Sequence, residues 1–83
     1  VMIVTGASRG IGAAIAIAGA KAGYRVAVHY GTHGEEAEAV RVRIQADGGT
    51  ALTIGGDMAS EEDIVAMFRA VDDRLGTVTA LVN

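Results

Sequence analysis

Short apolar segments alternate with longer segments of helical periodicity, and this alternation restricts the fold more than any other feature of the sequence. Four apolar segments are predicted strands: Val1–Val4, Arg25–Tyr30, Thr50–Ile54 and Val78–Val82. Each pair of successive strands is separated by a predicted helix. Strands joined through a helix of about twelve residues pair in parallel, because the chain must cross back over the sheet. The order βαβαβαβ therefore predicts an α/β protein with a parallel sheet and helices on its faces.

Apolar residues recur at helical spacing in each predicted helix. The first helix spans Ile11–Ala22, the second spans Glu35–Ala46, and the third begins after Ser60 and ends before Gly76. Ser60 with Asp63 three residues later resembles a capping box. The apolar residues are Ile11, Ile15, Ala18 and Ala22 at helical spacing in the first helix, Ala37, Val40 and Ile44 on one face of the second, and Ile64, Phe68, Val71 and Leu75 as a stripe in the third.

Right-handed crossovers leave few strand orders for such a sheet. We predict the Rossmann-type doubly wound order 3-2-1-4, which sets strand one beside strand four and opens a crevice at their carboxyl ends. Thr5 and Asn83 directly follow these two strands, so we expect both residues at the crevice.

The stretch TGASRGIG, from Thr5 to Gly12, connects the first predicted strand to the first predicted helix. Glycine adopts positive φ and lets a ligand approach the backbone, and a first helical turn offers unpaired N–H groups. Such a turn suits a diphosphate, although the general G-x-G-x-x-G pattern fails because its third glycine would fall on Ile15. A tight turn without a ligand is the alternative. Arg9 argues against a turn without a ligand, because a cation at a helix N-terminus is unfavourable unless an anion lies nearby.

Composition narrows the classes of function further. The net charge of −3 argues against a general nucleic-acid surface, and the absence of cysteine excludes disulfides and thiolate sites. The longest uncharged run, Gly10 to Ala20, is too short to span a membrane and lacks the charged region that precedes a signal-peptide core. The acidic run SEEDI is predicted to be a helix start rather than a metal site. Because the chain begins inside an apolar run and ends on ALVN, we expect both ends to be cuts within a longer protein.

Three motifs resemble those of the short-chain dehydrogenase/reductase family. TGASRGIG is similar to its T-G-x-x-x-G-x-G motif, GGD at Gly55–Asp57 falls where the family carries its adenine-pocket aspartate, and LVN at Leu81–Asn83 falls at the start of its N-N-A-G motif. The resemblance covers the whole chain and is nearest in character to 3-oxoacyl-carrier-protein reductases and related carbonyl or sugar dehydrogenases. It implies that residues 1–83 are the NAD(P)-binding, N-terminal portion of a longer single-domain reductase.

The resemblance implies a set of cofactor-binding residues: Gly6, Ser8, Arg9, Gly10, Ile11, Gly12, Tyr30, Gly31, Thr32, Asp57, Met58 and Asn83. In the family, the three glycines at these loop positions shape the loop around the diphosphate. Ser8 and Arg9 would face the adenosine ribose, and Ile11 would offer its backbone near the phosphates.

The remaining roles concern the adenosine half of the cofactor. By resemblance, Asp57 accepts a hydrogen bond from the adenine amino group, Met58 covers the ring and Asn83 borders the ribose. For Asp57, a plain turn or helix-entry aspartate is the alternative.

The segment HYGTHG after the second predicted strand bears on the choice of nicotinamide cofactor. A carboxylate there would pair with the 2′-hydroxyl of NAD and repel the 2′-phosphate of NADP. No acid occurs before Glu35, and Gly31 stands where NAD-preferring relatives usually place aspartate. With Arg9 available to bind a dianion, we predict NADP(H) in preference to NAD(H). Thr32 and His33 could assist, with a solvated loop as the alternative for both.

Several other residues are predicted to be structural. His29 lies inside a strand, where histidine is packed or solvent-facing more often than catalytic, and neither Tyr24 nor Tyr30 has a lysine at the family's catalytic spacing. Two positions depart from the family pattern. Gly19 falls within a helix, at a cost of about 1 kcal/mol relative to alanine, and Thr79 stands where many members carry aspartate.

The catalytic serine, tyrosine and lysine of the family all belong to positions after Asn83, so no catalytic residue is assigned to this chain. We predict a cytoplasmic NADPH-dependent oxidoreductase that acts on a small-molecule carbonyl or alcohol and forms homo-oligomers, tetramers by family resemblance. No nucleic acid, membrane or metal partner is expected. A non-catalytic dinucleotide-binding module is the alternative. A flavodoxin-like receiver domain fits less well, because the loop suits a diphosphate and not an acidic pocket.

Overall fold

The computed structural model describes the whole chain, residues 1–83, and contains one parallel sheet. Its strands are β1 (Met2–Val4), β2 (Val26–Tyr30), β3 (Ala51–Gly55) and β4 (Ala80–Val82). They lie in the order β3-β2-β1-β4, and every pairing is parallel. The predicted 3-2-1-4 order of a Rossmann-type sheet is therefore confirmed.

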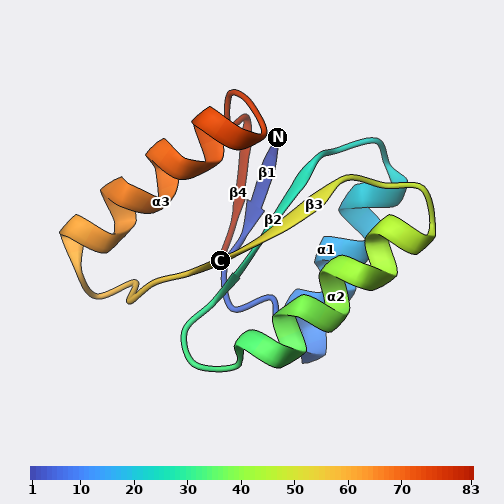
Figure 1. Cartoon of the computed structure of the whole chain (residues 1–83), viewed down its shortest axis with the longest axis horizontal. Helices are drawn as coiled ribbons and strands as arrows, with labels where there is room; N and C mark the ends of the chain where they lie inside the picture. The colour runs from blue at the N-terminus through green and yellow to red at the C-terminus, as the bar shows by residue number, and fades with distance from the viewer.

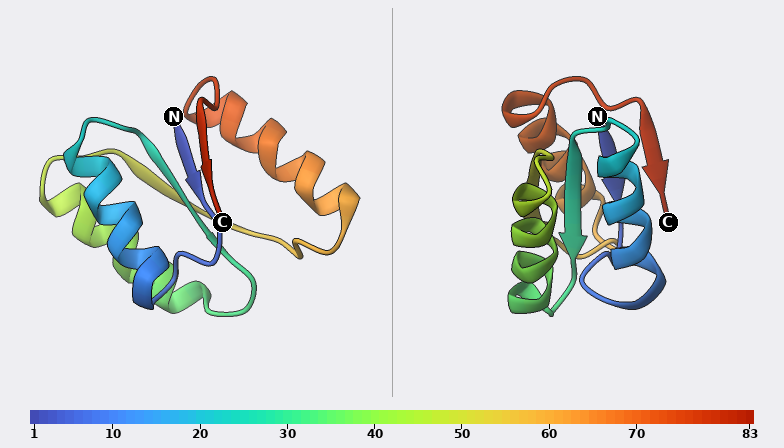
Figure 2. Two further views of the ribbon diagram at one scale, coloured as in Figure 1. Left: turned by 180° about the vertical axis from the view of Figure 1, so that it is seen from behind. Right: turned by 90° about the vertical axis from the view of Figure 1, so that its right-hand side faces the viewer.

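Helices cover both faces of this sheet, as Figures 1 and 2 show. On one face lie α1 (Gly10–Lys21) and α2 (Gly34–Ala46), and on the other lies α3 (Glu61–Arg74). Successive strand residues point to opposite faces, so β1, β2 and β3 each contribute to two cores. The larger core, beneath α1 and α2, contains Met2, Val4, Ala7, Ala16, Val26, Val28, Ala37, Val40, Ile44 and Ala51. The smaller core, beneath α3, contains Ile3, Ala27, Leu52, Met67, Val71 and Leu75.

The inward face of α1 is not simply the apolar series at helical spacing. The structure buries Ala16 and Gly19 and packs Ile15 partly against the core, whereas Ile11 is 81% exposed and Ala18 and Ala22 are also exposed. The fully buried positions of α1 are thus occupied by its smallest residues. A Cβ atom at Gly19 would lie 2.7 Å from the sulfur of Met2. Gly19 therefore has a packing role that offsets part of its low helix propensity.

The faces of α2 and α3 follow the sequence pattern. Ala37, Val40 and Ile44 are the buried residues of α2, as predicted. In α3 and its C-cap, Val71 and Leu75 are buried as predicted. Met67, which the prediction omitted, is buried as well, and two predicted residues, Ile64 and Phe68, are only half-buried.

The predicted N-cap of α3 is present, with one change of partner. The backbone N–H of Asp63 donates to Oγ of Ser60 at 3.2 Å. In a full capping box the side chain of the third helical residue accepts a hydrogen bond from the backbone N–H of the cap residue. Here the Asp63 carboxylate instead accepts from the backbone N–H of Asp57 at 2.8 Å. The start of α3 is thereby tied to the turn that follows β3.

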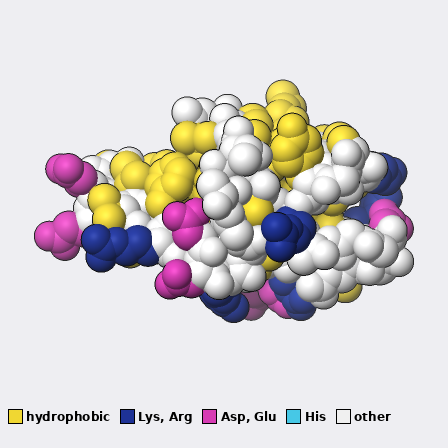
Figure 3. Space-filling model, turned by 90° about the horizontal axis from the view of Figure 1, so that it is seen from above, with side chains coloured by type: hydrophobic (Ala, Val, Ile, Leu, Met, Phe, Trp, Pro, Cys, Tyr) yellow, Lys and Arg dark blue, Asp and Glu magenta, His cyan; other side chains and the backbone are white.

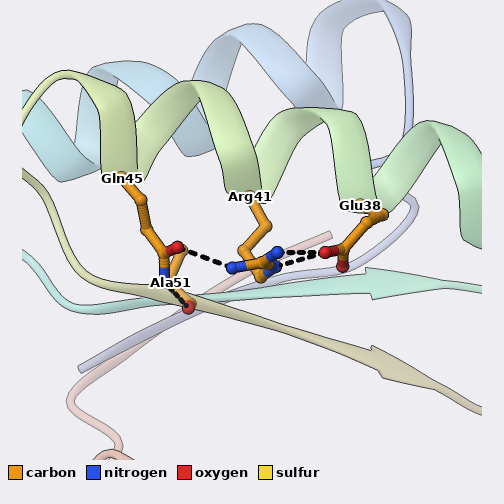
Figure 4. A network of polar contacts seen from close by, with 4 residues as sticks. All are labelled: Glu38, Arg41, Gln45 and Ala51. Atoms are coloured by element: carbon orange, nitrogen blue, oxygen red, sulfur yellow. Dashed lines mark hydrogen bonds and ion pairs between the residues drawn. The ribbon is translucent and has the colours of Figure 1, made fainter.

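A polar network connects α2 to the start of β3 (Figure 4). Arg41 donates to the carboxylate of Glu38 and, at 2.6 Å, to Oε1 of Gln45. Gln45 donates in turn to the carbonyl oxygen of Ala51 at 3.3 Å. The hydrogen bond from Arg41 lowers the pKa of the Glu38 carboxyl, and the same bond raises the pKa of Arg41. Exposed pairs of this kind contribute little to stability, so the main effect is to orient Gln45 toward β3.

Candidate functional site

The carboxyl ends of β1 and β4 lie side by side at the point where the strand order reverses, which is where a crevice is expected. The backbone N–H of Thr5 donates to the carbonyl of Val82 at 2.9 Å. The Thr5 hydroxyl lies 3.2 Å from that carbonyl and 3.2 Å from Oδ1 of Asn83. Thr5 and Asn83 are therefore neighbours at the point where the strand order reverses, as predicted.

The loop from β1 to α1 depends on glycine at three positions for two different reasons. Gly6 and Gly10 have positive φ angles of 60° and 64°, and no other part of the chain crowds them. A Cβ atom at Gly12 would lie only 2.4 Å from the carbonyl oxygen of Gly6. Gly12 thus allows the first turn of α1 to pack directly against the loop, and the glycines at 6 and 10 allow the loop to turn.

Five successive backbone N–H groups of this loop, Ser8 to Gly12, make no hydrogen bond within the chain. Unpaired N–H groups at the start of a helix carry a partial positive charge. The start of α1 has no side-chain cap and no acidic residue in its first turn. By contrast, α2 and α3 both carry acidic residues in their first turns. Of the helices in this fold, α1 alone presents an uncompensated positive end, and it does so at the crevice.

Arg9 is paired within the chain, so its predicted role in binding a dianion, which stays a prediction, would require a change of partner. Its Nε lies 3.5 Å from Oε2 of Glu36, and its Nη2 lies 2.7 Å from Nε2 of His33. A guanidinium can only donate, so the His33 nitrogen accepts. The pairing arises because α1 and α2 lie on the same face of the sheet, which brings their first turns together. The loop from Gly31 to His33 contains no acid, but Glu36, which follows it in α2, places a carboxylate beside Arg9.

Asp57 forms a turn at the carboxyl end of β3. Its Oδ1 accepts from the backbone N–H of Ala59 at 2.8 Å, which is the turn role considered as the alternative. The residue is exposed, so the turn leaves its other carboxylate oxygen accessible. Met58 is half-buried against the core beneath α3. Contacts of Asp57 and Met58 with an adenine ring remain predictions.

The residues after β2 surround the opposite side of the crevice. The ring of Tyr30 packs against Gly55, where a Cβ atom would lie 3.0 Å from Cε2 of the ring. Gly31 and Thr32 are exposed, and Thr32 helps to line a shallow hollow of about 260 Å³ with His33. Cofactor contacts of Tyr30, Gly31 and Thr32 stay predictions.

His29 was expected to be packed or solvent-facing, and the structure shows it packed and bonded to the site. It is 3% exposed, with Nδ1 at 3.1 Å from the backbone nitrogen of Gly6 and Nε2 at 2.9 Å from the carbonyl oxygen of Gly56. The only sign in the sequence is a polar ring at the carboxyl end of an apolar strand. That pattern does not reveal which loops the ring contacts.

The largest hollow of the surface, about 650 Å³, lies apart from the loop between β1 and α1. It runs along the exposed side of α3 and is lined by Glu61, Glu62, Val65, Ala66, Arg69, Ala70 and Asp73. No group of three or more histidine, aspartate or glutamate side chains is placed to hold a metal ion. None of the helices is both long and apolar enough to cross a membrane.

The chain is similar in sequence and structure to known reductases. The sequence profile described as short chain dehydrogenase matches residues 1–83. The 3-oxoacyl-acyl-carrier-protein reductase FabG of Staphylococcus aureus is 43% identical over 81 residues, which is 98% of this chain and 33% of that protein.

Solved structures agree with the sequence matches. A hydroxysteroid dehydrogenase from Escherichia coli superposes with a TM-score of 0.92 at 39% identity, over 99% of this chain and 34% of its own. The landomycin C-6 ketoreductase LanV, crystallised with bound NADP and rabelomycin, has a TM-score of 0.80 at 41% identity, over 92% of this chain and 33% of its own. The chain thus spans about a third of the length of the proteins that it matches.

Proposed function

This chain belongs to the short-chain dehydrogenase family, and from that premise we propose that the crevice at the carboxyl ends of β1 and β4 binds the dinucleotide NADP(H). In its reduced form the bound dinucleotide would donate a hydride to a small carbonyl substrate, and in its oxidised form it would accept a hydride from an alcohol. The observation that carries the proposal is the row of free backbone N–H groups from Ser8 to Gly12. Donors of this kind at a helix N-terminus bind phosphate groups without any charged side chain.

In addition to the N–H donors, the shape of the loop fits a diphosphate. Gly12 has no side chain, so the first turn of α1 lies directly against the carbonyl of Gly6, and the free N–H groups of the loop and of this turn stay close together. A diphosphate placed there would face peptide nitrogens and the positive end of α1. The chain would contribute Thr5 and Asn83 at the floor of the same crevice, where their side chains are already in contact.

The proposed preference for NADP(H) rests on Arg9 and on the absence of an acid in the loop from Gly31 to His33. Glu36 now holds Arg9, so a 2′-phosphate would have to replace the Glu36 carboxylate as its partner. This exchange of partners costs little free energy, because the side chains of Arg9 and Glu36 are exposed to solvent, at 64% and 46% respectively. An exposed pair of this kind is worth about 0 to 1 kcal/mol, less than a guanidinium gains beside a dianion.

Replacing Arg9 by alanine is expected to reduce the affinity for NADPH roughly tenfold and to leave the affinity for NADH nearly unchanged. The reason is that only NADPH carries the 2′-phosphate that Arg9 would bind. Fluorescence titration of the full-length protein with each dinucleotide measures both affinities. Arg69→Ala, which removes an exposed arginine from α3 on the other face of the sheet, is the control for net charge. An unchanged preference in Arg9→Ala would refute the assignment of the 2′-phosphate.

Replacing Glu36 by glutamine is expected to increase the affinity for NADPH by roughly threefold, because Arg9 would no longer be held by a carboxylate. Glu35→Gln is the matched control, since it removes the same charge from the same first turn of α2 but breaks no ion pair. The same titration measures both variants. Equal gains from the two substitutions would mean that only overall charge matters and that the Arg9–Glu36 pair does not tune the site.

We also propose that residues 1–83 form the cofactor-binding portion of a longer reductase. Two observations support this: the matched relatives are about three times as long, and β4 is an edge strand with Leu81 47% exposed. Hydrophobic side chains also gather across the upper half of the face drawn in Figure 3, whereas most charged side chains lie at its ends and along its lower half. An exposed apolar edge of this kind favours pairing with a further strand.

The catalytic serine, tyrosine and lysine of the family would then lie in the remaining chain, together with the surfaces of a cytoplasmic homotetramer. Oxidation of NADPH in the presence of small carbonyl compounds tests this proposal. Tight binding of NADPH without any turnover, in a protein that lacks a tyrosine followed four residues later by lysine, would instead favour a non-catalytic dinucleotide-binding module.

A further inference from the structure

His29 is a polar side chain buried in an otherwise apolar strand. It is the fourth residue of β2, whose sequence is VAVHY, and it is 3% exposed. A buried polar ring is unfavourable unless its nitrogens are hydrogen-bonded. Both ring nitrogens of His29 have partners, and these partners belong to two loops, one after β1 and one after β3.

These two partners define the tautomer of the ring. The backbone nitrogen of Gly6, at 3.1 Å, can only donate, so Nδ1 accepts and carries no proton. The carbonyl oxygen of Gly56, at 2.9 Å, can only accept, so Nε2 carries the ring proton. The geometry therefore requires the neutral Nε2–H tautomer, with each nitrogen assigned to one loop.

The backbone of His29 holds the first of these loops at a second point. Its carbonyl oxygen accepts from the N–H of Ala7 at 2.8 Å. The N–H groups of Gly6 and Ala7 are thus directed to His29, whereas those from Ser8 to Gly12 remain free. The boundary between the anchored and the free part of the loop lies directly after the residues that His29 binds.

We propose that His29 is a positioning residue for dinucleotide binding. Its Nδ1 holds the glycine loop in the conformation that presents the free N–H groups, and its Nε2 fixes that loop relative to the turn that carries Asp57. The proposal rests on the function proposed above, because it assigns to His29 an effect on the ligand of that site. At 3% exposure His29 cannot reach a ligand itself, so its effect passes through Gly6.

Two amide side chains can separate the two ring hydrogen bonds. The Oδ1 atom of asparagine lies near the position of Nδ1 in histidine and can accept from Gly6, whereas Nε2 of glutamine lies near the position of the histidine Nε2 and can donate to Gly56. We expect His29→Asn to bind NADPH within about threefold of the wild type. We expect His29→Gln to bind it roughly tenfold more weakly, because Gly6 loses its acceptor.

The affinities are measured by fluorescence titration of the full-length protein, together with the Tm of each variant. Each variant loses one buried hydrogen bond, so we expect similar decreases in Tm for both. Weaker NADPH binding by His29→Gln than by His29→Asn, at similar Tm, would support the role of His29 in positioning the loop. Equal affinities, or losses that simply follow Tm, would show that His29 only stabilises the fold and would overturn the proposal.

Measurements on the ligand-free protein separate this proposal from the proposed function. We expect the amide hydrogen of Gly6 to exchange faster in His29→Gln than in His29→Asn, and the ¹⁵N shifts of wild-type His29 to report the Nε2–H tautomer. Equal Gly6 exchange rates, or the Nδ1–H tautomer, would overturn the anchoring by Nδ1. If the wild-type protein binds neither NADPH nor NADH, the proposed function fails, and the exchange data still decide whether His29 holds the loop.

Discussion

Replacement of Gly12 by alanine is expected to reduce dinucleotide affinity by about a hundredfold, because a displacement of roughly 1 Å at a binding loop is enough for such a loss. The added Cβ would lie 2.4 Å from the carbonyl oxygen of Gly6, so either the loop or the first turn of α1 must move. The obstacle is backbone, which cannot rotate away as a side chain can. The gain of about 1 kcal/mol in helix propensity acts in the opposite direction but does not restore the geometry.

Two further glycine substitutions show whether the close approach is the cause. Gly10→Ala meets no atom within 4 Å and suffers only from its φ of 64°, a strain of about 1 to 2 kcal/mol, so we expect an intermediate loss of roughly tenfold. Gly48→Ala also meets no atom within 4 Å and has a φ of 87°, but it follows α2 at the amino end of β3, away from the loop, so it should leave binding unchanged. NADPH titration of the three variants should therefore rank them as Gly12, Gly10 and Gly48, in decreasing order of loss. A loss at Gly12 no greater than at Gly48 would contradict the role of the loop.

The strand order could be predicted from the sequence because it follows from rules that act on whole elements. Parallel pairing and right-handed crossovers depend on the alternation of strands and helices, not on any single contact. The same holds for the meeting of Thr5 and Asn83, which depends only on β1 lying beside β4. Capping of α3 by Ser60 was also predictable, because it involves residues three positions apart.

Helical spacing of apolar residues does not identify the inward face of α1, because hydrophobicity and closeness of packing point to different residues there. Ile11 is the most hydrophobic residue of the first turn, yet it is 81% exposed. The sheet instead receives Ala16 and Gly19, which have small side chains or none. A pattern that weighs only hydrophobicity cannot identify a helix that packs through glycine.

Glu36 and His29 were missed at the candidate site for a different reason. Each acts on a residue more than twenty positions away, Arg9 in one case and Gly6 in the other. Neither contact belongs to a local motif, since both depend on how α1, α2 and β2 come together. Sequence spacing located the loop that would hold a diphosphate, but the side chains that orient this loop or compete for its arginine became visible only in the folded chain.

Replacement of Ile3 by alanine is expected to lower the free energy of unfolding by about 2 to 5 kcal/mol, the range observed when a fully buried isoleucine or leucine is truncated. Ile3 is 0% exposed and lies in β1, between β2 and β4. It is the largest fully buried side chain of the core beneath α3, which has only six buried members. A core this small offers few neighbours that could shift to fill the cavity, so we expect a value in the upper part of the range. Urea denaturation of the full-length protein, followed by circular dichroism, measures it.

Ile11→Ala is the matched control, because it removes the same atoms from a side chain that is 81% exposed. We expect that substitution to change the free energy of unfolding by less than about 0.5 kcal/mol, as is usual for surface positions. It also keeps the backbone N–H of Ile11, so NADPH binding should be retained. Equal destabilisation by the two substitutions would contradict the assignment of Ile3 to the core and of Ile11 to the surface. A difference of several kcal/mol would confirm that Ile3 belongs to the core beneath α3 and that Ile11 lies on the surface.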